Sequence, residues 1–263
     1  MTHAEWADIV PLLIPAAYFI ALAVEARWPA RPFPPRRGWR WLGLGFLALI
    51  AMVGVLLPLA LPLEWMAAHR WFDGTRLGLA GGTVVGWLVL SFVSFAMHRA
   101  NHAWSPLWRA VHQLHHSPQR VDIAGSLLFH PAEMAVQVML QLFVTVIVLG
   151  LDPLAASLVG VVAALHGIFQ HWNVRTPRWI GYLVQRPESH MLHHERGVHG
   201  RNYSDFPLWD MLFGSFVNPD RFDGDVGFDA PADRRLGEML LWQDVNAPSL
   251  GRGNRGARTL ATG

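Results

Sequence analysis

The chain has 263 residues, 52% of them hydrophobic, with 13 tryptophans and only 15% charged residues, which is too apolar for a soluble domain of this length and predicts a membrane protein. It contains no cysteine, which excludes disulfides, thiolate metal sites, iron–sulfur clusters and cysteine nucleophiles. All 21 basic residues are arginines, so the meaning of the positive charge depends on where those arginines lie.

Five apolar runs are candidates to span the membrane, since about 20 residues are needed to cross the hydrocarbon core. They are Ile9–Ala26, Trp41–Leu63, Leu77–Met97, Met134–Leu149 and Pro153–Phe169. The start of the chain lacks the basic residues of a signal peptide and carries Glu5 and Asp8, so we expect a retained first helix.

The fourth and fifth runs are separated only by the short sequence LGLDP, Leu149–Pro153. Its glycine favours the end of one helix and its proline favours the start of the next, which predicts a tight hairpin over 134–169. The hairpin either crosses the membrane and returns or dips in without fully crossing. Both versions bring the chain back to the side from which it started.

The arginines are distributed unequally along this path. If the N-terminus is outside, the loop Glu25–Arg40 lies inside with five arginines, as do the segments His98–Pro131 and Gln170 onward. Only Arg70 and Arg76 remain outside. The positive-inside rule therefore predicts a multi-pass protein with its C-terminus in the cytoplasm.

Twelve of the fourteen histidines fall between residues 98 and 199, at cytoplasmic ends of apolar runs or in adjoining segments. They form an H-x3-H pair at 98 and 102, H-x2-HH triplets at 112–116 and 190–194, and a pair at 166 and 171. The first three spacings place imidazoles on one stripe of a helix. The five-residue spacing does not, so we expect the helix to end or widen between His166 and His171.

Ten imidazoles in these four motifs exceed the coordination sphere of one ion, which favours two metals. Neutral imidazole suits iron, copper, nickel and zinc alike. A zinc hydrolase is disfavoured because Glu195 follows the histidine pair in HHER, whereas H-E-x-x-H places the base between the ligands. Two irons that activate dioxygen beside a lipid chain fit the pattern better, because such chemistry can break an unactivated C–H bond.

The order of these motifs resembles the fatty acid hydroxylase and sterol desaturase superfamily of integral membrane di-iron enzymes. The resemblance runs from about His98 to Phe216 through HRANH, HQLHH, FHP, HGIFQHWNV, HMLHH and NYSDFPLWDMLFGSF. The sequence departs from the family at Ser204 and Asp205, where a glycine often follows the aromatic residue. That difference concerns the local turn.

The resemblance implies the identity of the metal ligands: His98, His102, His112, His115, His116, His171, His190, His193 and His194, with His166 added. His130 and His199 also match family positions, and we expect them next to the ligands. The implied reaction is dioxygen-dependent hydroxylation or desaturation of a lipid, such as a fatty acyl chain or a sterol, at a di-iron centre.

Four carboxylates near the motifs are candidates to orient ligand imidazoles through the second ring nitrogen: Asp122, Glu133, Glu188 and Asp210. Helix caps or partners for arginine are equally expected roles for them.

An external source of electrons is also expected, because the chain has no cysteine for an iron–sulfur cluster and no nucleotide-binding G-x-G-x-x-G unit. A ferredoxin or small cytochrome with its reductase would dock at the cytoplasmic face. Arginines near the histidines would steer it by charge: Arg99, Arg109, Arg120, Arg175, Arg178 and Arg201. No nucleic-acid module is recognisable.

The sequence thus predicts an all-α membrane protein of four or five apolar helices with a cytosolic helical cap that carries a dimetal site. Residues 1–97 are the N-terminal transmembrane helices, 98–220 the catalytic region, and 221–263 a cytosolic segment that ends in a disordered basic tail, Leu250–Gly263. The alternatives are a membrane haem protein, a metal transporter and a noncatalytic lipid-binding scaffold. Histidines in one edge layer fit poorly with haem ligands that face each other across a bundle or with a transport site at the midplane.

Overall fold

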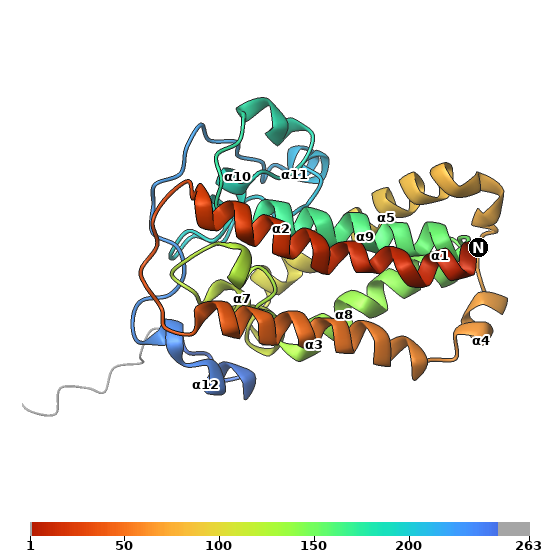
Figure 1. Cartoon of the computed structure of the whole chain (residues 1–263), viewed down its shortest axis with the longest axis horizontal. Helices are drawn as coiled ribbons and strands as arrows, with labels where there is room; N and C mark the ends of the chain where they lie inside the picture. The colour runs from red at the N-terminus through yellow and green to blue at the C-terminus, as the bar shows by residue number, and fades with distance from the viewer. Residues whose placement is uncertain (1, 247–263) are drawn as a thin grey trace, which may run out of the picture.

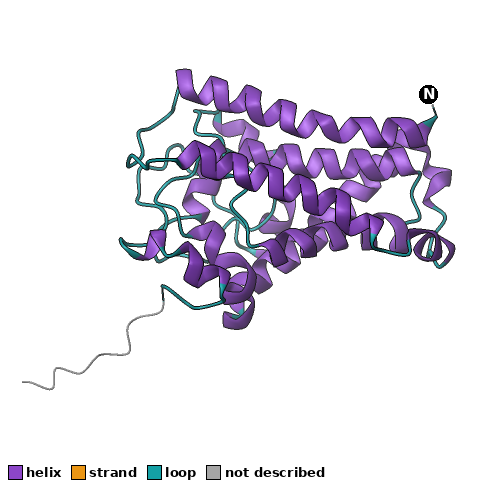
Figure 2. Ribbon diagram, turned by 60° about the horizontal axis from the view of Figure 1, so that its bottom comes forward, coloured by secondary structure: helices purple, strands orange, loops and turns teal. Residues whose placement is uncertain are grey.

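A computed structural model of the chain describes residues 2–246, so the predicted tail Leu250–Gly263 lies outside the described residues. The long helices are α1 (His3–Ile9) continued through a 3₁₀ turn by α2 (Leu13–Arg27), α3 (Trp39–Leu59), α5 (Gly78–Ala103), α8 (Pro131–Leu142) and α9 (Pro153–Gln170). Shorter helices are α4 (Leu63–Ala68), α6 (Ser105–Leu107), α7 (Gln113–His116), α10 (Pro187–His193), α11 (Leu208–Phe213) and α12 (Leu236–Leu240). Figure 2 shows helices and loops without a strand over these residues.

Within residues 2–246, five stretches of helix are long and apolar enough to cross a membrane. They are His3–Arg27, Trp39–Leu59, Gly74–Ala103, Pro131–Val148 and Pro153–Gln170. The last turns before Val148 widen into a π-helix over Phe143–Val148, which extends α8 to spanning length. The predicted all-α membrane fold with its apolar helices is therefore confirmed, and the first apolar run extends further toward the N-terminus than the sequence indicated.

The long helices run side by side with alternating direction, so the loops gather at two ends of the bundle (Figure 1). At one end, His3 Nδ1 lies 3.0 Å from Asp152 Oδ2, and the amide of Gly74 donates to the carbonyl of Leu149 at 2.7 Å. The N-terminus, the loop before α5 and the hairpin turn before α9 therefore share that end. The helices and loops that carry the histidine motifs occupy the other end.

Helices α5 and α9 pack closely because small residues line their contact. A Cβ atom added at Gly86 would lie 2.7 Å from side-chain atoms of both Leu151 and Val159. Close backbone approach through small residues is a common way for helices to associate in a bilayer, because the hydrophobic effect does not drive helix association there. This contact fixes the axis of α5, whose last turns carry His98 and His102.

The buried carboxylate of Glu25, near the end of α2, connects two loops at the histidine end of the bundle. Glu25 Oε2 accepts hydrogen bonds from the amides of Ile123 and Asn173, both at 3.0 Å. Ile123 follows one histidine triplet and Asn173 lies two residues after His171. The first membrane helix therefore fixes the positions of these two loops relative to each other.

Candidate metal centre

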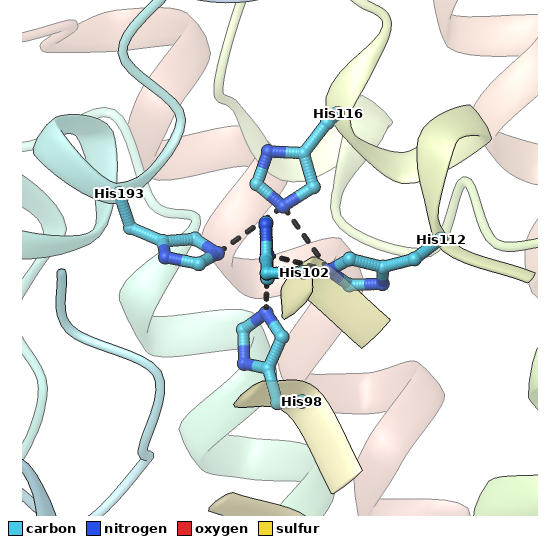
Figure 3. Close-up of side chains that lie close together, drawn as sticks. All are labelled: His98, His102, His112, His116 and His193. Atoms are coloured by element: carbon cyan, nitrogen blue, oxygen red, sulfur yellow. Dashed lines mark hydrogen bonds between the residues drawn. The ribbon is translucent and has the colours of Figure 1, made fainter. Parts of the chain in front are cut away.

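Five histidines from three separate segments converge at the end of the bundle (Figure 3). His98 and His102 lie on α5, His112 precedes α7 and His116 ends it, and His193 ends α10. Their Nε2 atoms form a chain of short contacts, with 3.3 Å between 98 and 102 and 3.1 Å each for 102–112, 112–116 and 116–193. All five candidate ligand nitrogens lie within 4.8 Å of one another.

A second group contains four buried histidines: His115, His171, His190 and His194. The Nε2 atom of His171 lies 3.1 Å from that of His115 and 3.0 Å from that of His190, and His194 Nε2 lies 3.1 Å from His190 Nε2. The two groups together contain nine of the ten predicted ligands.

The two triplets are divided between the groups. His116 and His193 belong to the five-histidine group, whereas their chain neighbours His115 and His194 belong to the four-histidine group. Adjacent residues on a helical turn point in different directions, so one H-x2-HH triplet can supply both sites. The segment that carries the first triplet begins with a π-helical stretch, Trp108–His112, a local widening that is frequent at functional sites.

The nitrogen spacing fits coordination of one ion by each group. A metal about 2.1 Å from each imidazole nitrogen would hold ligands about 3.0 Å apart at octahedral angles and about 3.4 Å apart at tetrahedral angles. Six of the seven contacts, at 3.0 to 3.1 Å, are closer to the octahedral value. The contact of 3.3 Å between His98 and His102 is closer to the tetrahedral value.

The outer ring nitrogens fix which way several imidazoles present their lone pairs. Nδ1 of His98, His171 and His193 lies 2.6 to 2.7 Å from the carbonyl oxygens of Tyr203, Gly167 and Arg201, respectively. A carbonyl only accepts, so the neutral ring carries its proton on Nδ1 and turns a bare Nε2 lone pair inward. Facing lone pairs repel one another, and a cation between them removes that repulsion.

Burial keeps the imidazoles outside the membrane spans neutral, which metal binding requires. It lowers the pKa of His171 to about 4. The pKa values of His116 and His194 lie well below the usual value, first because of burial and then because each faces other imidazoles. At neutral pH these rings therefore offer lone pairs without first losing a proton.

One predicted carboxylate contacts a ligand imidazole directly. Glu133 Oε1 lies 2.7 Å from His112 Nδ1, and both side chains are buried. Asp210 acts one step further out, because its carboxylate accepts the amides of Tyr203 and Ser204 and so holds the carbonyl that contacts His98.

The other two carboxylates take the alternative roles named above. Asp122 accepts hydrogen bonds from Trp39 Nε1 and the amide of Gly125 and pairs with Arg120. Glu188 pairs with Arg186 at 2.9 Å. Neither touches an imidazole.

His166 lies outside both groups. Its ring stacks on Trp87 at 5.3 Å, and its Nδ1 lies 2.9 Å from the carbonyl of Val162. Helix α9 ends at Gln170, between the two histidines, as their spacing predicted. His171 therefore joins the four-histidine group, whereas His166 stays on the helix and contacts Trp87.

His130 and His199 have different positions around the site. His130 accepts the amide of Ala132 and caps α8. His199 stacks beside His102, with ring centroids 5.5 Å apart. His199 therefore lies next to a candidate ligand, whereas His130 has a structural contact.

Several contacts at the centre left no signal in the sequence. The backbone carbonyls of Gly167, Arg201 and Tyr203 orient imidazoles, and carbonyl position does not depend on residue type. The ring of Phe129 stacks on His115 with centroids 4.2 Å apart. The FHP motif pointed to that phenylalanine without indicating its role.

The fold and these two groups define a helical membrane protein whose paired histidine sites could hold metal ions. The chain belongs to the fatty acid hydroxylase family, whose profile matches residues 83–215. The matched region contains every histidine of both groups. The family resemblance read from the motifs is thereby confirmed.

Two curated relatives are hydroxylases. The ornithine lipid hydroxylase OlsE of Rhizobium tropici is 30% identical over 188 residues, which cover 67% of this chain and 55% of the relative. The fatty acid hydroxylase vlmA of Lecanicillium sp. is 26% identical over 211 residues, which cover 74% of this chain and 54% of the relative. The chain thus spans about half the length of these relatives. No solved structure matches it.

Proposed function

We propose that this chain is a non-haem di-iron monooxygenase that hydroxylates a lipid. The observation that carries the proposal is the convergence of nine histidine Nε2 atoms into two adjoining groups with contacts of 3.0 to 3.3 Å. Hydroxylation is favoured over desaturation because both curated relatives are named as hydroxylases.

The five-histidine group would hold one iron and the four-histidine group the other, with His166 excluded from both. The two groups would offer five and four nitrogen ligands, fewer than the six that an octahedral ion takes. Two irons would supply the activation of dioxygen and the removal of hydrogen from an unactivated C–H bond. The chain contributes neutral nitrogen ligands, fixes their orientation through the outer ring nitrogens and keeps water from the buried rings.

The electron balance requires a separate donor. Insertion of one oxygen atom into a C–H bond reduces the second oxygen atom to water, which consumes two electrons and two protons. We infer that a ferredoxin or small cytochrome with its reductase delivers those electrons at the histidine end.

We assign the histidine end to the cytoplasm, so that the histidine motifs of region 98–220 and the C-terminal segment 221–263 share that side with residues 28–38. The turn of the hairpin 134–169 lies at the opposite end. The arginine distribution supports this orientation. Arg70 and Arg76 pair with Asp73 at the opposite end of the bundle, with N–O distances of 3.6 and 3.3 Å.

The function is tested by mass spectrometry of host lipids with and without the chain. We expect one lipid class to gain a single oxygen atom when the wild-type chain is present and to remain unmodified with His115→Ala or His193→Ala. Loss of two hydrogens without added oxygen would replace hydroxylation by desaturation. An unchanged lipid profile in cells that contain iron-loaded protein and a donor system would refute the proposal.

A further inference from the structure

An open hollow of about 410 Å³ is lined by residues at the start of α3. Helix α3 begins at the histidine end of the bundle (Figure 1). Its lining contains three arginines, Arg36, Arg40 and Arg120, and no acidic side chain. Trp39 and Trp41 complete the wall. None of these residues belongs to either histidine group.

The positive charge of this hollow is only partly neutralised. Arg120 pairs with the buried Asp122, whereas Arg36 and Arg40 have no ion pair among the described residues. Burial lowers the pKa of the Arg36 guanidinium; Asp233 opposes that shift, and the charges of Arg234 and Arg120 add to it. Asp233 itself pairs with Arg234 at 3.6 Å and lies outside the lining. Two guanidinium groups therefore remain available to an anion.

The first turn of α3 adds backbone donors to these cations. Its N-cap is Gly38, at φ 72°, and no side chain caps this end. A Cβ atom at Gly38 would meet nothing within 4 Å, so the approach to the first turn is open. The amide of Trp39 donates to the carbonyl of Arg36 at 3.3 Å, which leaves the amides of Arg40 and Trp41 without an acceptor in the helix. The helix dipole at this end favours negative charge.

The hollow also lies at the polar boundary of a candidate span, because the stretch Trp39–Leu59 begins in its wall. Trp41 is 77% exposed, whereas Trp39 is buried and donates to Asp122. Exposed tryptophan at the end of an apolar span is typical of the headgroup level of a bilayer. A phosphate in the hollow would therefore be at the depth of lipid phosphates.

We propose that Arg36, Arg40 and the open first turn of α3 form a binding site for the phosphate group of an anionic phospholipid. Guanidinium groups suit phosphate because they donate paired hydrogen bonds in a planar fork. Basic pockets beside membrane helices are suited to acidic headgroups for the same reason. The site is independent of the proposed hydroxylase activity.

Native mass spectrometry of the full chain in detergent, titrated with phosphatidylglycerol, tests this site without reference to turnover. We expect retention of phosphatidylglycerol over phosphatidylcholine. The double variant Arg36→Gln/Arg40→Gln should weaken phosphatidylglycerol binding about tenfold or more, and the exposed Arg40→Gln alone should weaken it severalfold. Arg70→Gln/Arg76→Gln is the matched control, because it removes the same charge at the opposite end.

Elution volume and thermal unfolding in detergent show whether each variant is folded. Phosphatidylglycerol binding unchanged in folded Arg40→Gln and in the double variant would overturn the proposal, as would an equal loss in the Arg70→Gln/Arg76→Gln control. Competition with inorganic phosphate distinguishes the source. We expect no displacement of lipid by an equal concentration of phosphate, and displacement at that concentration would contradict the lipid assignment in favour of a soluble phosphate ligand.

Discussion

His116 and His194 stack face to face, with ring centroids 4.1 Å apart and an interplanar angle of 19°, although they belong to different histidine groups. Each is also the chain neighbour of a histidine from the opposite group. The boundary between the two candidate metal sites is therefore made of the ligands themselves. A change at one site is expected to disturb the other.

Removal of one boundary ligand should reduce the metal content of the chain. We expect purified wild-type protein to carry about two irons per chain and His194→Ala to lose at least about one of them, because the four-histidine group falls to three ligands. His166→Ala and His3→Ala should keep both irons, since neither ring lies in a group. Elemental analysis measures the content, and full iron in His194→Ala would exclude this residue as a ligand.

Glu133→Gln should weaken metal binding while preserving the size of the side chain. The carboxylate contacts His112 Nδ1 at 2.7 Å and makes the imidazole a more basic ligand. Loss of such an outer contact costs about 10- to 100-fold in metal affinity. Competition with a chelator measures the change, and the exposed Glu64→Gln is the charge-matched control. Equal affinity in Glu133→Gln and wild type would show that this contact does not tune the ligand.

We predict that Arg186, which directly precedes α10, contributes strongly to the free energy of unfolding of the protein. Its side chain is fully buried, pairs with Glu188 at 2.9 Å and donates to the carbonyls of Pro219 and Asp220. Arg186→Met would leave the half-buried carboxylate of Glu188, which also accepts from Thr176, and two carbonyls without this partner. We expect a cost of about 3 kcal/mol.

Thermal unfolding in detergent should therefore show a clear fall in the melting temperature of Arg186→Met. Arg178→Met is the control, since its pair with Asp220 is exposed and worth about 1 kcal/mol or less. Similar melting temperatures for the two variants would contradict a stabilising role for the buried arginine.

The orientation predicts the location of reporters fused to the chain. A reporter after Gly263 should be cytoplasmic and one inserted at Asp73 should be external. Asp73 precedes Gly74, whose amide donates to Leu149 in the hairpin turn, at the end of the bundle opposite the histidines. Protease protection in sealed vesicles measures both. Reporters found on the same side would refute the proposed path.

The sequence predicted the apolar helices because they depend on composition. It predicted the nine grouped histidines because their motifs depend on spacing along one helix and resemble those of a known family. It could not divide the histidines between two groups, since that requires the relative rotation of α5, α7 and α10. His166 matched a motif that also contains His171, but the end of α9 at Gln170 separates their directions. Glu25 accepts backbone amides from two distant loops. No motif in the sequence indicated this role, because a glutamate near the end of a membrane helix is expected to be solvated.

The most direct test of the account follows isotopically labelled dioxygen into the lipid. Iron-loaded protein in a bilayer, supplied with a reductase, an electron carrier and an identified lipid substrate, should place one labelled oxygen atom in the product. Turnover should stop when the carrier is omitted and should be absent in His194→Ala but unchanged in His3→Ala. An unlabelled hydroxyl group derived from water, or equal product from wild type and His194→Ala, would contradict oxygen activation at the paired histidine sites.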